Sequence, residues 1–431
     1  MTKSKVQGQR TYTRIKINVI NYNYLKYCII IILLLWKNIM KFINKFDSMD
    51  PLNLNDSLSL AEKSIQQQIR EFAITELAPL INDGFFNEDQ GINLLRKLGM
   101  LKVFGGELAQ NYGGPVISPV AYGLIAYELE KIDSGLRTVL SVMGSLAMKS
   151  IALFGSKEQQ NKYLPLLNEG KLVASFALTE PEHGSDIGSM ETTAKKTDAG
   201  YVINGAKRWI GLAPYADIII TWARCEDSIV RGFLVKKGSA GLSIEPIKNK
   251  ISLRVAVQGE IVYNNVTVSH DDLLPLSNGL SAAFTCLNYA RYGIAWGAWG
   301  AAQACFEECL DYVKNRQAFG VPLAAKQLIQ EKLVKMQIEI ALGLNACLQV
   351  GRLLEQDKAS FYMINLLKYN STVKALDIAR TARDMLGGNG ILADNNIMRH
   401  MVNLESVVTY EGTRDIHLLT LGRELTGFSA F

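Results

Sequence analysis

The sequence around two charged residues, Glu411 and Arg137, suggests a catalytic or ligand-binding role. Glu411 lies between Tyr410 and Gly412. A carboxylate in such a place can take a proton from a substrate, and the glycine beside it lets a backbone approach closely. The same three residues also describe an ordinary turn whose carboxylate forms a salt bridge. The local sequence therefore predicts either a general base or a structural ion pair.

Arg137 lies in a predicted helix that is otherwise rich in apolar residues, and a guanidinium there needs an anionic partner. Ser141 follows one turn later on the same face of the helix. The anion is either a carboxylate of a ligand or the side chain of Asp133, four residues before Arg137. This segment predicts a binding site for a charged group or an internal ion pair.

Several other kinds of site do not match the sequence. The four histidines never fall at metal-ligand spacing, so no metal site is predicted and a His-based metal hydrolase is disfavoured. The six cysteines include no Cys-x-x-Cys pair, which fits a reducing compartment better than a disulfide scaffold. Neither the Gly-x-Gly-x-x-Gly nor the P-loop pattern of nucleotide sites occurs, and the Ser-Asp after Gly184 lacks the hydrolase elbow.

Three patterns follow one another along the chain and must position these residues. From about Asp50 to Lys171 apolar residues recur at helical spacing, and Ser118-Pro119 marks the start of a long helix as N-cap and first helical residue. After Leu172, short β-branched runs alternate with Gly, Asn and Asp turns. Four such runs predict strands: Tyr201–Gly205, Ile218–Trp222, Arg231–Val235 and Glu260–Val268. From roughly Ser281 the helical period returns. One helix there has an apolar stripe made of Leu328, Ile329, Leu333, Met336, Ile340 and Leu344.

These patterns predict an α+β protein of three domains after a leader over residues 1–45. An N-terminal all-α domain covers 46–172, a middle β barrel or sandwich covers 173–280, and a C-terminal four-helix bundle covers 281–431.

The leader has an unusual charge, because residues 1–46 carry nine Lys or Arg and no acid. Subtracting these nine from the 46 Lys and Arg leaves 37 bases against 41 acids, so the body has a net charge of about −4 and no nucleic-acid surface is expected. A basic segment without acids is typical of a mitochondrial transit peptide and predicts the mitochondrial matrix. Its apolar run Cys28–Trp36 is too short to span a bilayer but matches a secretory h-region. An over-extended gene model with a later start at Met49 is a third interpretation.

Six motifs occur in order along this α-β-α pattern. They are Leu178-Thr-Glu-Pro181, Gly184-Ser-Asp186, Asn204-Gly205 followed by Lys207-Arg-Trp-Ile210, Arg316-Gln-Ala-Phe-Gly320, Gly387-Gly-Asn-Gly390 and Tyr410-Glu-Gly-Thr413. With these motifs the chain resembles the acyl-CoA dehydrogenases from about Phe46 to Phe431. Within that family it is most similar to the glutaryl-CoA dehydrogenases, through the segments Glu130–Arg137, Leu287–Trp296 and Thr409–His417.

The resemblance implies an FAD-dependent oxidation of an acyl-CoA thioester. Removing the proton next to the thioester carbonyl needs a carboxylate in an apolar site, and Glu411 matches the family's base. No side chain accepts the hydride from the β carbon, so a flavin must be supplied. The implied FAD contacts, partly from a neighbouring subunit, are Phe176, Leu178, Thr179, Ser185, Trp209, Ile210, Gly211, Arg316, Phe319, Gln327, Gly387, Gly388, Thr413 and Asp415.

The resemblance also implies a substrate with a distal carboxylate, which would meet Arg137 and Ser141. The implied substrate contacts are Arg137, Thr138, Ser141, Ser185, Asn288, Arg291, Tyr410 and Gly412. The expected reaction is the oxidative decarboxylation of glutaryl-CoA to crotonyl-CoA and carbon dioxide, as in lysine and tryptophan degradation. Electrons would pass to an electron-transfer flavoprotein, and the protein would be a homo-oligomer, most simply a tetramer.

Gly211 departs from the family pattern, since the dehydrogenases usually place Thr or Ser after the Trp-Ile pair. A similar Trp-Ile-Gly occurs in plant-type short-chain acyl-CoA oxidases. A short-chain acyl-CoA oxidase or dehydrogenase is therefore the alternative function. A third hypothesis, from a different class, is a flavin-fold scaffold without catalysis.

Overall fold

The computed structural model describes residues 47–87 and 90–430, so the predicted leader and its apolar run Cys28–Trp36 lie outside the described residues. Leu54–Phe431 form one compact unit. Residues 47–53 belong to a separate unit and are turns, bends and irregular chain.

The first part of the larger unit is helical, and polar residues explain where several helices begin. Ser59 and Ser156 form capping boxes at their helices. The predicted start at Ser118-Pro119 is confirmed, because the Ser118 hydroxyl accepts a hydrogen bond from the Ala121 amide at 3.1 Å. The elements are η1 (Leu54–Ser57), α2 (Leu60–Phe72), η2 (Ala73–Leu77), α3 (Ala78–Asn87), α4 (Gly91–Met100), η3 (Gly106–Tyr112), α5 (Pro119–Ile132), α6 (Ser134–Leu140), η4 (Ser141–Met148), α7 (Lys149–Phe154) and α8 (Lys157–Asn168).

Two of these segments, η2 and η4, are π-helical. The sequence did not predict them, because a π segment shifts the backbone hydrogen bonds without changing the polarity of the side chains. Every residue of α6 and η4 is buried. Single π turns are frequent at functional sites, and η4 begins at Ser141, one turn after Arg137.

The middle part is a curled sheet of seven strands with a core of its own. The strands are β1 (Ala174–Ala177), β2 (Thr193–Thr197), β3 (Gly200–Gly211), β4 (Ile218–Cys225), β5 (Val230–Lys236), β6 (Leu242–Pro246) and β7 (Gln258–Ser269). Their order is β1-β4-β2-β3-β7-β6, and β5 pairs with β4. The four expected β-branched runs fall inside β3, β4, β5 and β7. Ile203, Ile219 and Phe233 are fully buried between the strands.

The last part is helical again and is organised around one long helix. Its elements are α9 (Leu280–Asn315), β8 (Gln317–Ala318), β9 (Val321–Pro322), η8 (Leu323–Ala325), α10 (Gln327–Leu354), α11 (Phe361–Met385), η9 (Gly387–Ile391), α12 (Asn396–Val407) and α13 (Arg414–Thr426). α9 packs in two directions. Trp296 lies against Gly123 of α5, and Trp299 lies against Gly343 of α10, where a Cβ on either glycine would collide with the indole.

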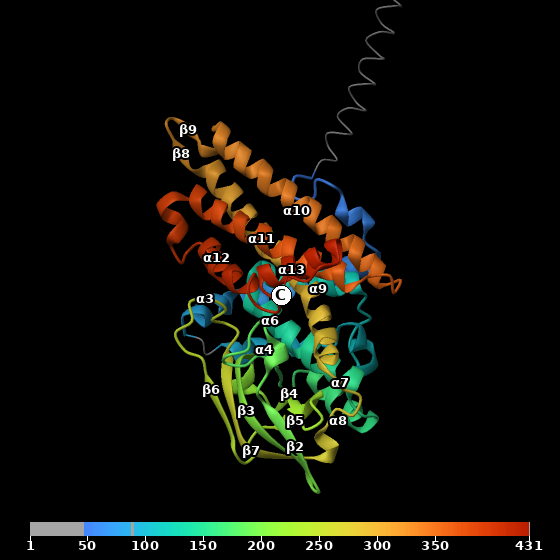
Figure 1. Ribbon diagram of the computed structural model, residues 1–431. Helices are drawn as coiled ribbons and strands as arrows, with labels where there is room; N and C mark the ends of the chain where they lie inside the picture. Colours follow the sequence, from blue (N-terminus) through green and yellow to red (C-terminus); the bar gives the residue numbers. More distant parts are fainter. Residues whose placement is uncertain (1–46, 88–89, 431) are drawn as a thin grey trace, which may run out of the picture. The chain divides into compact units, whose positions relative to one another are not determined.

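The arrangement confirms the predicted α+β class, with N-terminal helices, a middle β region and C-terminal helices. Helices α10 to α13 and the short strands β8 and β9 lie at one end of the unit and strands β2 to β7 at the other, with α4 and α6 between them (Figure 1). A single apolar core joins the N-terminal and C-terminal helices. Residues of α6, α9 and α11 can therefore meet in a buried site.

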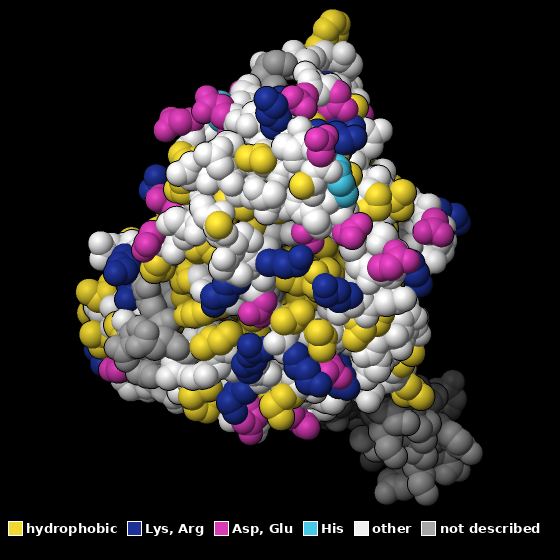
Figure 2. Space-filling model, turned by 90° about the horizontal axis from the view of Figure 1, so that it is seen from below, with side chains coloured by type: hydrophobic (Ala, Val, Ile, Leu, Met, Phe, Trp, Pro, Cys, Tyr) yellow, Lys and Arg dark blue, Asp and Glu magenta, His cyan; other side chains and the backbone are white. Residues whose placement is uncertain are grey.

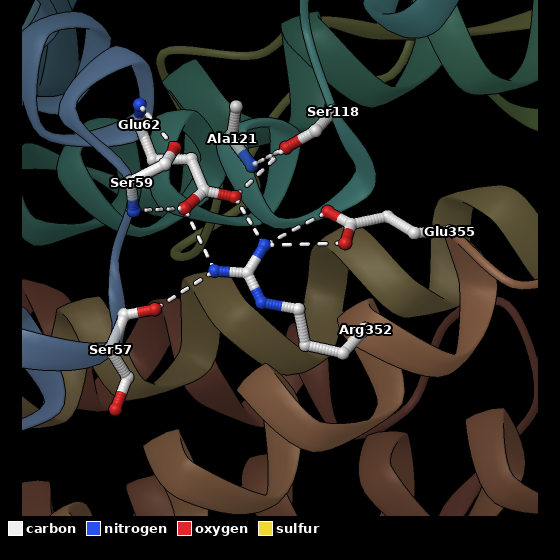
Figure 3. Close-up of polar contacts among 7 residues, drawn as sticks. All are labelled: Ser57, Ser59, Glu62, Ser118, Ala121, Arg352 and Glu355. Atoms are coloured by element: carbon white, nitrogen blue, oxygen red, sulfur yellow. Dashed lines mark hydrogen bonds and ion pairs between the residues drawn. The ribbon is translucent and has the colours of Figure 1, made fainter.

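An ion-pair cluster fastens α10 to the N-terminal helices (Figure 3). The Arg352 guanidinium donates to both carboxylate oxygens of Glu62, at 2.6 and 2.9 Å, and to the Ser57 carbonyl at 3.0 Å. Glu62 also completes the capping box of α2 and accepts from the Ser118 hydroxyl at 3.1 Å. Burial raises the pKa of this carboxyl, but the hydrogen bonds from Arg352 and Ser59 outweigh it and lower the pKa to about 2.

The outer face of α10 differs from the sequence prediction. Met336 and Ile340 of the predicted stripe are buried, but Leu328 is 72% exposed. A second apolar row faces outward at four-residue spacing. Its members are Val334, Ile338 and Leu342, each at least half exposed. The helix thus has two apolar faces, one against the bundle and one on the surface.

Two helical stretches in the described part of the chain are long and apolar enough to cross a membrane. One is Ser134–Phe154, which is 83% buried in the protein, and the other is α10. The apolar residues of Ser134–Phe154 lie in the protein core, and those of α10 lie on its two apolar faces, one against the bundle and one on the surface.

The face seen from below in Figure 2 carries both signs of charge. Hydrophobic side chains gather near its middle with Lys and Arg side chains beside them, and Asp and Glu are spread around. This face is not uniformly basic.

Candidate active site

Glu411 lies in the short loop between α12 and α13, with its backbone in the left-handed region at φ 51°. Its Oε2 atom is buried and has no hydrogen-bond partner in the protein. Burial raises the pKa of the carboxyl, although the positive charges of Arg137, Arg291 and Lys368 act in the opposite direction. A buried carboxyl with a raised pKa and a free oxygen can act as a general base.

Three successive carbonyls of this loop accept hydrogen bonds from buried cations. Arg291 of α9 donates through Nε to the Glu411 carbonyl at 2.8 Å. Lys368 of α11 donates to the carbonyls of Tyr410 at 2.8 Å and of Gly412 at 2.6 Å. The loop is therefore held from two helices. Arg291, expected at coenzyme A, spends one donor here and others on Asn288 and Asn365.

Arg137 is only 1% exposed and pairs with Glu130 at 2.7 Å. The alternative partner considered from the sequence, Asp133, is wrong for a physical reason. Asp133 is the N-cap of α6, so its side chain turns back to the Gly135 amide at 2.7 Å and pairs with Arg399 at 3.0 Å. Residues four apart lie side by side only within a helix, and Asp133 is outside α6 as its N-cap.

A group of buried polar atoms in and near Glu411 has no hydrogen-bond partner in the part of the chain that the structure describes. They are Arg137 Nη1, Ser141 Oγ, Tyr410 Oη and Glu411 Oε2. The Arg137 guanidinium lies 5.4 Å from the centre of the Tyr410 ring and its charge acts on Glu411, while Ser141 follows Arg137 by one helical turn. Thr138 is different, because its hydroxyl donates to the Ser134 carbonyl at 2.8 Å and accepts from Arg137. Buried polar atoms are rarely left unpaired, so a polar ligand is the natural partner for this group.

A cavity of about 240 Å³ adjoins this cluster. Its walls include Tyr122, Ser145 and Asn288, and the Tyr122 and Ser145 hydroxyls are 2.6 Å apart. Burial raises the pKa of Tyr122 to about 12; the Arg137 charge lowers this pKa and the Glu411 charge raises it. Asn288 in the cavity wall accepts a hydrogen bond from Arg291, which also holds the Glu411 carbonyl, so the cavity adjoins the cluster. Mostly apolar walls with a few hydroxyls suit an elongated, largely apolar ligand.

The predicted flavin edge, from Phe176 to Thr179 at the end of β1, is fixed by β3. The Arg208 amide donates to the Thr179 carbonyl at 2.9 Å, and Lys207 donates to the Leu178 carbonyl at 2.8 Å. Lys207 is fully buried and also pairs with Glu180 at 2.9 Å. Burial lowers the pKa of Lys207 to about 8, against the pull of Glu180. This internal ion pair was not predicted, although both residues lie in the quoted motifs.

Trp209 follows with a left-handed backbone and a side chain that is 54% exposed. The next residue, Ile210, is buried in the core of the sheet. Gly211 packs so closely on η4 that a Cβ there would come within 2.9 Å of the Val142 side chain. Packing thus supplies a reason for a glycine at this position that does not involve a flavin.

The other predicted flavin residues do not reach this region within one chain. Arg316 directly follows α9, 25 residues after Arg291, and a helix of that length spans ~37 Å. Phe319 beside it is 94% exposed, and Gln327 starts α10 on the surface. Gly387 and Gly388 follow α11 with open space where side chains would stand. These five residues lie at the far end of the bundle.

The remaining predicted residues have simple positions. Ser185 is exposed in the loop after β1, and Asp415 is exposed and paired with Arg414. Thr413 is the N-cap of α13, accepting from the Ile416 amide at 3.2 Å.

The fold and the buried cluster around Glu411 occur in a chain that belongs to the acyl-CoA dehydrogenase family. The family's N-terminal, middle and C-terminal domains match residues 59–171, 175–266 and 277–426. The family is FAD-dependent, and the chain is an acyl-CoA dehydrogenase.

Individual relatives differ in what they act on. Acyl-CoA dehydrogenase of Bacillus subtilis is 31% identical, over 84% of this chain and 97% of its own length. 3-(Aryl)acrylate reductase of Clostridium sporogenes is 30% identical over the same shares. The structure of glutaryl-CoA dehydrogenase from Mycobacterium smegmatis is 39% identical with a TM-score of 0.87, covering 89% of this chain and 99% of that one. The structure of a glutaryl-CoA dehydrogenase from the same organism, in complex with FADH2, is 40% identical with a TM-score of 0.86 over the same shares.

The residues present fit a flavin. Trp209 offers an exposed aromatic face beside a strand end whose carbonyls are fixed by β3. At the far end of the bundle, Phe319 is almost fully exposed, and no side chain or backbone atom lies near the Cβ positions of Gly387 and Gly388. An open glycine turn and exposed aromatic rings can receive a dinucleotide.

Proposed function

We propose that the protein oxidises glutaryl-CoA with loss of carbon dioxide. The observation that carries the proposal is the free Arg137 Nη1, buried beside the unpaired hydroxyls of Ser141 and Tyr410. A straight-chain acyl tail would leave these three groups unsatisfied in an apolar pocket, at a cost of about 1 to 3 kcal/mol for each. A distal carboxylate accepts hydrogen bonds from all three kinds of donor.

The balance of charge supports an anionic tail. With Lys368 protonated, the cluster holds three cations, Arg137, Arg291 and Lys368, against the carboxylates of Glu130 and Glu411. One positive charge is then uncompensated in a site shielded from water. The similarity to glutaryl-CoA dehydrogenase of Mycobacterium smegmatis points the same way.

The chain's own residues would act as follows. Arg137, Ser141 and Tyr410 bind the distal carboxylate and thereby place the α carbon near Glu411. Glu411 takes the α proton at Oε2, and FAD, when bound, accepts the β hydrogen with its electron pair, which gives glutaconyl-CoA. The bond to the distal carboxylate then breaks, its electrons remain on the organic fragment, and carbon dioxide leaves. Glu411 returns its proton to the γ carbon, which yields crotonyl-CoA.

The test is turnover of glutaryl-CoA by the FAD-loaded protein, with a ¹³C label in the distal carboxylate. We expect labelled carbon dioxide and crotonyl-CoA in equal amounts, and slower turnover of butyryl-CoA. Turnover of butyryl-CoA without any labelled carbon dioxide from glutaryl-CoA would refute the proposal.

A short-chain acyl-CoA oxidase is the second candidate, favoured by Gly211 in place of a hydroxyl residue. Oxygen consumption in step with substrate use, compared with use of an artificial electron acceptor, distinguishes the two. As dehydrogenase, the protein would pass its electrons to an electron-transfer flavoprotein.

We also propose that the protein is a homo-oligomer, most simply a tetramer, in the mitochondrial matrix. The exposed row of Val334, Ile338 and Leu342 on α10 is an apolar surface that a second copy can cover. The ~37 Å between Arg291 and Arg316 supports a flavin site shared between copies. Light scattering of the purified protein tests the assembly, and a monomer would refute it.

A further inference from the structure

The loop that carries Glu411 has a backbone that does not hold its shape unaided. Glu411 and Gly412 are consecutive residues with positive φ, at 51° and 100°. For a residue with a side chain, the left-handed region costs roughly 1 to 2 kcal/mol, so surrounding contacts must maintain it. Gly412 also has no room for a side chain, because a Cβ there would lie 2.8 Å from His417 Nε2.

Lys368 supplies the contacts that bracket this turn. Its ammonium donates to the carbonyl before Glu411 and to the carbonyl after it, at 2.8 and 2.6 Å. The side chain is completely buried on α11, and among the described residues it forms no ion pair with a carboxylate. Burying a cation without a paired anion destabilises the folded state, so the position of Lys368 beside the loop needs a functional explanation.

We propose that Lys368 is a positioning residue for the base: its ammonium clamps the left-handed turn that carries Glu411 and places a positive charge beside that turn. The inference rests on the assignment of Glu411 as base but not on glutaryl-CoA as substrate.

The electrostatics agree with this geometry. Burial lowers the pKa of Lys368 to about 7, with Glu411 opposing and Arg291 and Arg137 adding to the fall. Conversely, the Lys368 charge lowers the pKa of Glu411, against the effect of burial. Each charge therefore favours the other, and removing the cation should raise the pKa of Glu411.

Lys368 is also faced by two arginines, a histidine and a tyrosine. Arg137 of α6 and Arg291 of α9 stay charged. His417 of α13 is neutral above its pKa of about 3, which burial and the neighbouring cations lower. The Tyr410 ring, 5.9 Å from the ammonium, stacks against it as an aromatic partner. We therefore attribute a change in the pH profile of a Lys368 variant to the mutual influence of Glu411 and Lys368.

The test compares Lys368→Met, which removes charge and donors, with Lys368→Gln, which keeps a donor without the charge. Lys374→Met is the matched control, since Lys374 lies on the same helix but pairs with Glu339 at the surface. The first readout is the pH profile of kcat/KM with both glutaryl-CoA and butyryl-CoA. We expect the acid limb to move up by about one pH unit in Lys368→Met and Lys368→Gln on either substrate, because the base loses a nearby cation. Lys374→Met should leave the limb in place.

The second readout does not need catalysis. Hydrogen exchange of the amides in 409–413, measured on the FAD-loaded protein, should be about tenfold faster in Lys368→Met and less affected in Lys368→Gln. Lower activity with an unmoved acid limb and unchanged exchange would reduce Lys368 to a packing residue and overturn the proposal. If no acyl-CoA is turned over by the wild type, the proposed function fails, while the exchange experiment still decides the role of Lys368.

Discussion

Replacing Arg137 by Met tests the substrate assignment most directly. The change removes the guanidinium but keeps an unbranched apolar side chain of similar length. It also strands Glu130, which is fully buried and whose pKa is already raised by burial, in spite of Arg137. We therefore add the double variant Glu130→Gln/Arg137→Met, in which no unpaired charge is left behind.

The size of the effect follows from how Arg137 is used. Nε is committed to Glu130 and Nη2 to Thr138, which leaves Nη1 for a ligand. Truncating one side of a buried charged pair costs ~2 to 5 kcal/mol. Since only part of the guanidinium is available, we expect the lower half of that range, about 2 to 3 kcal/mol. At 1.4 kcal/mol per decade this is a loss of roughly 30- to 150-fold in kcat/KM for glutaryl-CoA.

The measurement is the ratio of kcat/KM for glutaryl-CoA to that for butyryl-CoA, with bound FAD and thermal unfolding recorded for each variant. The ratio should fall in both the single and the double variant, because butyryl-CoA has no distal charge. Arg399→Met is the control, since it breaks another buried pair, with Asp133, that has no place in the ligand cluster. Equal losses on the two substrates in Arg137→Met, as in Arg399→Met, would mean that Arg137 serves the fold alone.

Three further outcomes are expected. Glu411→Gln should keep FAD and substrate binding but lower turnover ~100- to 10,000-fold, and a loss below tenfold would contradict its role as base. Gly211→Thr should lower the ratio of oxidase to dehydrogenase turnover, but only together with Val142→Ala, which makes room for the new side chain. An unchanged ratio in the folded double variant would show that Gly211 does not control the reaction with oxygen. Glu62→Gln should lower the free energy of unfolding at pH 7 by about 3 kcal/mol, from a pKa of about 2 against 4.5. Because the folded pKa is the lower one, this difference should shrink as the pH falls from 4.5 towards 2 in urea unfolding, and a constant difference would refute the link to Arg352.

The order of helices and strands could be predicted from the sequence because it rests on local patterns. Ser118-Pro119 carries its own capping signal, and the runs within β3 and β4 have β-branched residues at strand spacing. The π segment that begins at Ser141 could not be predicted, because it changes the backbone hydrogen bonds and not the polarity.

The candidate site was predictable where a residue type is unusual for its place. Arg137 in an apolar helix and Glu411 before a glycine are of this kind. Lys368 was missed because a lysine on an amphipathic helix normally faces water. One signal was present: polar residues at three- and four-residue spacing, Asn365, Lys368 and Thr372, form a buried row on α11. Only the packing of α11 under the loop shows what that row contacts.

The two-sided packing of α9 sets a limit on how such proteins can diverge by recombination. Trp296 needs the glycine at 123 on a helix of the N-terminal part, and Trp299 needs the glycine at 343 on α10. A chimera that joins the first half of this chain to the second half of a relative would retain the order of helices and strands of the family. It would nevertheless bring together a tryptophan and a helix surface that were not selected for each other. Segments that look like exchangeable modules in the sequence are, through α9, inherited together.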